Sequence, residues 1–193
     1  MLHTKLLFSS AIFALSTFAN ATVIDFNHLA HNDTFQTFNS IKTNGFVIKN
    51  DSQGSDRLGI WGKNDEFQAD KGHAAVFVNY SGSKTSLEQA NKSFFNFKSI
   101  DIGDVFNQGD SASIQFSFFN GQSTSFETVI LDRLKGLQTF VFNKNNITKV
   151  SWVGSNSQFD NINISTPVPE PETYALIGLG LTGLWIARRR KQS

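Results

Sequence analysis

The sequence contains no cysteine, so disulfides and thiolate metal sites are both excluded. A chain without such cross-links must be stabilised by packing or by a metal bound through other ligands, and the redox state of its compartment does not affect its fold. The chain also has few prolines. All three lie in residues 167–171, near the carboxyl end.

An excess of positive charge is also missing. The net charge of the whole chain is +1, but five of its 17 basic residues lie near the two ends, so residues 22–166 keep 12 basic and 14 acidic groups. Binding to nucleic-acid phosphates requires a concentrated basic surface. We therefore expect no nucleic-acid partner.

Catalytic signatures are scarce. The sequence has no Gly-x-Ser-x-Gly elbow, and spacing alone identifies no Ser-His-Asp arrangement. Asp65 and Glu66 are adjacent, so on a strand they would point to opposite faces and could not act as an acid and base pair. These absences favour a protein without catalytic activity.

The first 21 residues have the pattern of a secretory signal peptide. Lys5 provides the positive start, residues 6–18 form a short apolar stretch, and Ala19-Asn20-Ala21 is a small-x-small cleavage pattern. Signal peptidase is expected to cut after Ala21. The alternative, an uncleaved membrane anchor, would require a longer apolar run and a charged stop after it.

Residues 167–193 contain three zones with different preferred surroundings. Val168, Pro169, Glu170 and Pro171 begin an exposed, extended tether, because proline prevents helix continuation and the acids stay in water. A 14-residue apolar run follows and predicts a single membrane helix of about 21 Å, which is short for a hydrocarbon core of about 30 Å. It comprises Tyr174, Ala175, Leu176, Ile177, Gly178, Leu179, Gly180, Leu181, Thr182, Gly183, Leu184, Trp185, Ile186 and Ala187. The third zone is a basic stop expected on the cytoplasmic side of the membrane, formed by Arg188, Arg189, Arg190 and Lys191.

Two other interpretations of this segment remain open. It could be an amphipathic helix packed on the domain, although such a helix needs a polar face. Residues 178–183 also match a dinucleotide-binding fingerprint by letter, but they follow a proline tether and not a strand.

The order and spacing of these three zones resemble the PEP-CTERM sorting signal of bacteria with an outer membrane. This resemblance covers residues 167–193 only. It implies export, transient anchoring in the inner membrane, processing by an exosortase near Pro169-Glu170-Pro171, and a final place at the cell surface or outside the cell.

Residues 22–166 are predicted to form one all-β domain. Ile114, Phe116 and Phe118 alternate with polar residues, which is the period of a strand with one buried face. Nine such segments predict an antiparallel β-sandwich, while residues 86–90 could form one helical turn. The segments are residues 22–26, 45–49, 74–80, 94–102, 113–118, 125–131, 137–142, 147–153 and 159–164.

Three short stretches, residues 24–26, 97–102 and 159–162, resemble galactose-binding-like jelly-roll carbohydrate-binding modules. That resemblance implies a jelly-roll-like sandwich and a structural calcium held by acids on the first and last strands, here Asp25 and Asp160 with Asn161. Asp160 shares the parity of Ile162 and Ile164, so it should face inward and need a partner such as a cation. Alternatively, Asp160 and Asn161 only cap a loop.

Trp61, beside Gly59 and Gly62, and Trp152 are the aromatic residues best suited to stack on a sugar ring. Trp152 shares a strand with Val150, which favours a place in the core. The sequence thus predicts a surface or matrix protein that binds polysaccharide or supports a biofilm. The alternatives are a glycoside-active hydrolase on the same scaffold and a cargo that self-associates through edge strands.

Overall fold

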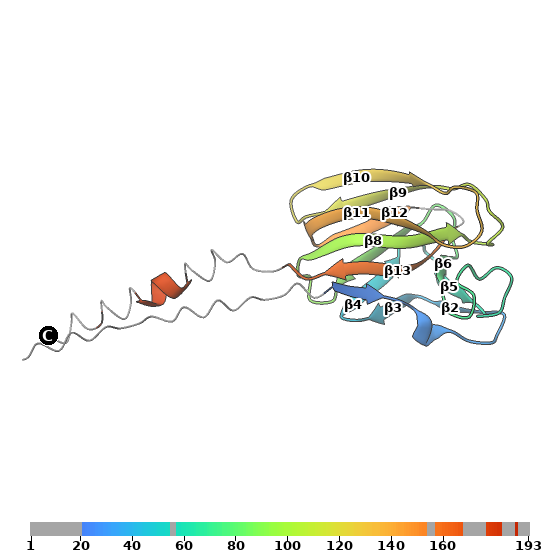
Figure 1. The fold of residues 1–193 in the computed structure, drawn as a ribbon, viewed down its shortest axis with the longest axis horizontal. Coiled ribbons are helices and arrows are strands. Elements are labelled where there is room, and N and C mark those ends of the chain that lie inside the picture. The colour runs from blue at the N-terminus through green and yellow to red at the C-terminus, as the bar shows by residue number, and fades with distance from the viewer. Residues whose placement is uncertain (1–20, 55–56, 154–156, 168–176, 183–187, 189–193) are drawn as a thin grey trace, which may run out of the picture. The chain divides into compact units, whose positions relative to one another are not determined.

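The structure, a computed structural model, describes residues 21–54, 57–153, 157–167, 177–182 and 188 (Figure 1). The chain divides into two compact units, residues 20–167 and the two ends together, residues 1–19 and 168–193. The signal peptide falls almost entirely outside the described residues.

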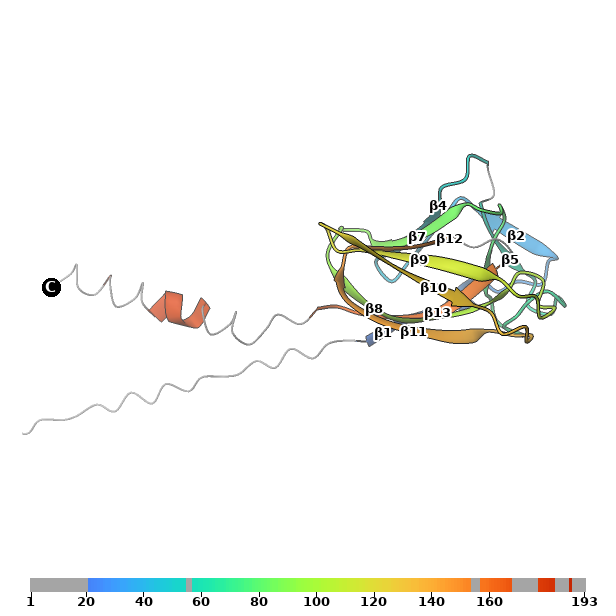
Figure 2. The same cartoon turned by 90° about the horizontal axis from the view of Figure 1, so that it is seen from above.

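Thirteen strands are present in the described residues, and they form two antiparallel sheets. One sheet has the order β11-β8-β13-β6-β5-β2, with β1 also paired to β13, and the other has the order β10-β9-β12-β7-β4-β3. Figure 2 shows the sheets as two stacked layers. The strands are β1 (Ala21–Ile24), β2 (Phe35–Phe38), β3 (Ser40–Thr43), β4 (Phe46–Asn50), β5 (Leu58–Trp61), β6 (Val76–Val78), β7 (Lys84–Gln89), β8 (Phe95–Asp104), β9 (Ser113–Phe119), β10 (Thr124–Ile130), β11 (Gln138–Ile147), β12 (Lys149–Val153) and β13 (Ser157–Ser165), and a 3₁₀ turn, η1 (Asn27–Leu29), follows β1.

The predicted antiparallel sandwich is confirmed, and its core is rich in phenylalanine. The fully buried Trp152 packs edge-on against Phe159, with ring centroids 5.0 Å apart, and stacks on Phe116 at 5.9 Å. Trp152 is therefore a core residue, as its place on a strand with Val150 predicts. Among the described residues, every member of the core lies between Ile24 and Ile164, so the sandwich buries an apolar core of its own.

Four strands were missed by the sequence pattern: β2, β3, β5 and β7. The predicted helical turn at residues 86–90 is wrong, because Lys84–Gln89 is a strand between β12 and β4. Its Thr85 and Leu87 are fully buried. Ladder hydrogen bonds on both sides therefore outweigh the weak local preference of this polar segment.

Within the other unit, residues 177–182 are helical. Thr182 Oγ1 donates a hydrogen bond to the carbonyl of Gly178 at 2.6 Å, as hydroxyl residues in helices often do. In the described part of the chain, no helix reaches the length and apolar character that a membrane crossing needs. The rest of the predicted tether, membrane helix and basic stop, apart from Arg188, lies outside the described residues.

Candidate binding site

Three loops meet at one end of the sandwich, around residues 62–75, 105–112 and 131–137. Along β13, Ser157 pairs with Asp104 at this end, whereas Ser165 pairs with Asn96 and Ala21 at the other. The first and last described residues of the sandwich therefore lie at the end opposite these loops (Figure 1).

The buried carboxylate of Asp104 organises the loop that follows β8. Asp104 Oδ1 accepts hydrogen bonds from the backbone N–H groups of Phe106 (3.0 Å) and Gln108 (3.1 Å). Asp104 Oδ2 accepts from Gly109 (2.8 Å) and Asp110 (3.3 Å). One side chain thus satisfies four backbone N–H groups that have no partner in a strand. This fixes the loop in a single conformation.

Two fully buried glutamines and an asparagine hold the 62–75 loop. Gln158 donates to the carbonyls of Phe67 and Asp104, both at 2.8 Å, while Gln68 donates to the carbonyl of Trp61 at 3.1 Å. Asn107 donates to the carbonyl of Gln68 at 3.3 Å and accepts from the N–H of Gly136 at 2.7 Å, so it links all three loops. Buried amides that are fully bonded in this way give a rigid framework.

Trp61, the predicted stacking residue, is at the centre of an aromatic cluster at this end. One face of its ring is stacked on Phe77, with centroids 4.6 Å apart and planes 23° apart, and its indole N–H donates to the carbonyl of Val105 at 2.9 Å. The rings of Phe35, Phe67 and Phe106 also lie against it, with centroids 5.2 to 6.3 Å from its own. Trp61 therefore supports the cluster, and the rings that the cluster exposes are Phe35 (53% exposed) and Phe106 (43%).

A shallow hollow of about 240 Å³ adjoins this cluster and is here called the loop hollow. It is lined by two aromatic rings and four polar side chains, Glu66, Phe67, Phe106, Asn107, Gln108 and Lys135. Its volume is below the roughly 300 to 1,000 Å³ of most small-molecule sites, which suits one sugar unit resting against the surface better than an enclosed ligand. An open ring beside amide, carboxylate and ammonium groups can stack on a sugar face and hydrogen-bond its hydroxyls.

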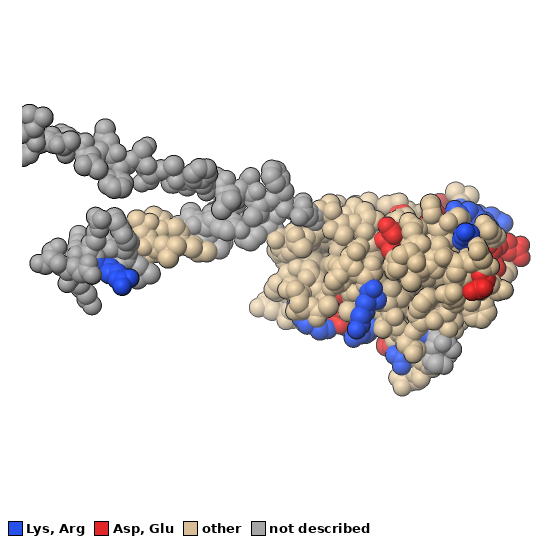
Figure 3. All heavy atoms as spheres, turned by 90° about the horizontal axis from the view of Figure 1, so that it is seen from below, with Lys and Arg blue, Asp and Glu red and all other residues tan. Residues whose placement is uncertain are grey.

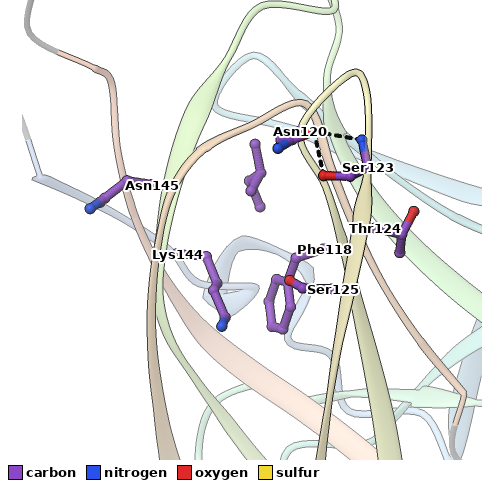
Figure 4. A pocket seen from close by; sticks show the side chains of 8 residues that line it. Phe118, Asn120, Ser123, Thr124, Ser125, Lys144 and Asn145 are labelled. Atoms are coloured by element: carbon purple, nitrogen blue, oxygen red, sulfur yellow. Dashed lines mark hydrogen bonds between the residues drawn. The ribbon is translucent and has the colours of Figure 1, made fainter.

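A second hollow of about 170 Å³ lies at the opposite end, between β11 and the β9–β10 turn (Figure 4). Its lining is formed by Phe118, Asn120, Ser123, Thr124, Ser125, Lys144, Asn145 and Ile147. Lys144 Nζ lies 5.2 Å from the centre of the Phe118 ring and is also paired with Glu127 on β10. Asn120 accepts hydrogen bonds from Ser123 within the turn. Asn120, Ser123 and Lys144 thus already have partners.

Asp160 is fully buried, but it lies on the outer face of its sheet. The sequence pattern predicts that it faces inward. Phe159 pairs with Ile102 in the core, so Asp160 and its register partner Asp101 face outward from the sheet. The bulge after Asp160, where Asn161 has φ +47°, changes the strand parity and returns Ile162 to the core. Parity counted along an uninterrupted strand could not reveal this.

The loop that covers the outer face brings Asp70 to Asp160. Neither carboxylate oxygen of Asp160 has a hydrogen-bond partner among the described residues. Burial, reinforced by the nearby Asp70 carboxyl, raises the pKa of Asp160 to about 8, although the backbone N–H groups of Asn161 and Phe26 oppose this. Its surroundings therefore favour the protonated form of Asp160.

Two of the three residues predicted to hold calcium have side-chain hydrogen bonds of their own. Asp25 Oδ1 accepts from the N–H of Asn27 at 3.2 Å, and Asn161 Nδ2 donates to Asp101 at 3.0 Å, so both side chains have other partners. In the described part of the chain, no three His, Asp or Glu side chains are grouped to hold a metal ion. Calcium at this place stays a prediction, and what supports it among the described residues is the buried carboxylate of Asp160.

Most of the residues that build this end gave no sequence signal. Asp70, Asp104 and Gln158 lie in or next to loops, and their partners are separated by up to 91 residues. Phe106 could have been noticed only as an aromatic residue in a loop region. Trp61 is the predicted site residue that the structure places beside the loop hollow.

Comparison with known families finds a match in residues 167–191, the PEP-CTERM protein-sorting motif. No curated protein matches the chain. This motif indicates an exported protein that is anchored in the membrane before exosortase processes it. The predicted tether, apolar run and basic stop thus coincide with the match to the PEP-CTERM protein-sorting motif.

Proposed function

We propose that this exported protein acts at the cell surface or in the extracellular matrix by binding polysaccharide at the loop hollow, without chemistry of its own. The observation that carries the proposal is the exposed Phe106 ring beside Glu66, Gln108 and Lys135, on loops that Asp104 and the buried amides hold rigid. A preorganised aromatic and polar surface binds sugars with little ordering cost.

The position of the hollow supports this role. It lies at the end of the sandwich opposite Ser165, after which the tether begins, so a sandwich held by its carboxyl end would present the hollow to its surroundings. On the face shown in Figure 3, acidic and basic residues are scattered among uncharged ones. That surface suits neutral glycans better than phosphate backbones.

The lining of the hollow also favours binding over hydrolysis. Glycosidases use two carboxyl groups roughly 5 to 10 Å apart, one on each side of the scissile bond. Among the residues that line the hollow, Glu66 is the one carboxylate. A glycoside-active enzyme on this scaffold is the second candidate, and its support is this single acid beside an aromatic ring.

The test is an array of bacterial exopolysaccharides, followed by calorimetry on the best ligand. Phe106→Ala should weaken binding about tenfold, or about 1.4 kcal/mol, because the open ring is lost. Phe94→Ala is the matched control, since Phe94 is similarly exposed but lies next to Gly121 at the other end. Equal affinity of wild type and Phe106→Ala would contradict the proposal, as would an absence of binding to every glycan. Release of shorter sugars would favour the hydrolase.

A further inference from the structure

Strand β10 is an edge strand with one unpaired side. It pairs with β9 through all seven residues without a register shift, and no described element lies on its other side. Figure 1 shows β10 along the outer margin of the sandwich. Its outward N–H and C=O groups can therefore pair with another strand.

The other edges of the two sheets have features that discourage such pairing. β1, β2 and β3 are each four residues long, and β3 also carries Lys42. β11 is longer but is interrupted by two register shifts, near Asn143 and Asn146, which both have φ +51°. Short length, lysine and bulges are devices that proteins use to protect their edges. β10 has no proline, no lysine and no bulge.

The side chains of β10 add an apolar, uncharged surface. Phe126 and Ile130 are 63% and 66% exposed, and they lie on the outer face because their register partners Ser117 and Ser113 alternate with buried residues of β9. Thr128 lies between them on the same face. The one charge of the strand, Glu127, faces inward opposite Phe116 and is neutralised by Lys144 of β11.

We propose that β10 pairs antiparallel with β10 of a second copy of this chain, about a twofold axis at Thr128. In this register Thr128 faces its own counterpart, Phe126 faces Ile130 of the second copy, and Glu127 faces Val129. A register centred on Glu127 would instead place two carboxylates opposite each other, which is unfavourable. The charge pattern therefore disfavours the register centred on Glu127, and the register centred on Thr128 pairs the exposed Phe126 with Ile130; this choice does not depend on what the loop hollow binds.

A second copy fits this edge better than an unrelated strand. Pairing of two identical edges places Phe126 of each copy beside Ile130 of the other, on either side of the Thr128 pair. Aromatic and branched cross-strand pairs of this kind stabilise sheets. A closed twofold contact of this type gives a dimer and not an open polymer.

The test uses the sandwich, residues 21–167, which contains the complete core. Its mass is measured by light scattering and sedimentation over a concentration series. We expect a dimer for the wild type and for Gln115→Lys, the matched control, because Gln115 is the register partner of Thr128 on the same face but lies one strand inside the edge. Thr128→Lys should raise the dimer dissociation constant at least about tenfold, because two lysines then face each other at the junction.

A mixing experiment tests the register. Thr128→Lys and Thr128→Glu should each be monomeric alone and should form a heterodimer when mixed, since residue 128 meets only its own counterpart. Circular dichroism and thermal unfolding must show that both variants are folded. A wild type that stays monomeric throughout, an open polymer, or folded variants that dimerise as the wild type does would each overturn the proposal.

Discussion

At the scale of single residues, buried polar side chains divide into two groups. Asp104, Gln68 and Gln158 are buried with several hydrogen bonds each, and they fix loops. Asp160 is equally buried, but its oxygens have no hydrogen-bond partner in the part of the chain that the structure describes. A buried acid of this kind costs free energy when it ionises, so it should leave a signature in the pH dependence of folding.

The contribution of Asp160 to stability is expected to fall as pH rises from about 4 to 8. The folded-state pKa of Asp160 is about 8, above its unfolded value, so the native protein binds the extra proton in this range and loses that advantage as pH increases. Asp160→Asn mimics the protonated form and cannot ionise. The free energy of unfolding of this variant minus that of the wild type should therefore increase by a few kcal/mol as pH rises across this range. Urea unfolding at several pH values measures it.

The control is Asp110→Asn, which changes an exposed carboxylate and should leave the pH profile unaltered. The charged groups near Asp160 are Asp70 with its ion-pair partner His73, at 3.3 Å, and the register partner Asp101. A parallel profile for wild type and Asp160→Asn would show that Asp160 is ionised when folded. If calcium raises the unfolding midpoint at pH 7 and Asp160→Asn abolishes this effect, the partner of Asp160 is a cation and not a proton.

At the scale of elements, some strands show a clear alternation of apolar and polar residues and others do not. The sequence could predict the first kind better than the second. β9 alternates strictly between buried and open residues and was found. β5 is Leu-Gly-Ile-Trp, three of whose residues are fully or largely buried, so it has no period of two. Gly59 in this strand gives room to Phe77, whose ring a Cβ atom would approach to 2.2 Å, and such a close contact has no local signature.

The loops of the candidate site could be predicted even less well. Their conformations depend on single side chains that reach across the fold, such as Gln158, which bonds to Phe67 although 91 residues separate them. Trp61 was found because an aromatic residue between glycines is conspicuous. The hollow beside it depends on Phe106, whose position is fixed by Asp104 and not by any ladder of strand hydrogen bonds.

Asp104→Asn is therefore expected to loosen the loop after β8. An amide has one acceptor oxygen in place of two, so at least two of the four N–H groups lose their partner. Hydrogen bonds to charged groups contribute about 1.5 to 3 kcal/mol each, so we expect about 3 kcal/mol of destabilisation. Hydrogen exchange should accelerate at Gly109 and Asp110 first, and glycan affinity should fall with it.

The comparison variant is Asp132→Asn, which removes an exposed carboxylate that accepts one bond, from Leu134, in another loop. It should cost less than about 1 kcal/mol. If the two variants unfolded at the same urea concentration, the Asp104 carboxylate would not be what holds the loop after β8.

At the scale of the whole molecule, folding and sorting use separate parts of the chain. The core of the sandwich lies between Ile24 and Ile164, whereas the sorting motif covers residues 167–191. The two parts also form separate compact units. Changes in the sorting motif should consequently alter processing while leaving the stability of the sandwich unchanged.

Replacement of Pro169, Glu170 and Pro171 by alanine tests this separation. Intact mass of the exported wild-type protein should show the loss of its carboxyl-terminal residues, whereas the triple variant should keep them, because the tether becomes competent for helix and loses the acid between its prolines. Gln192→Ala, outside the matched motif, should be processed as the wild type is. The unfolding midpoint of the sandwich should agree within about 1 °C between all three, because none of the changes removes a buried contact of the core. A wild type that retains Arg188 after export, or a triple variant that is cut normally, would show that this motif does not direct processing.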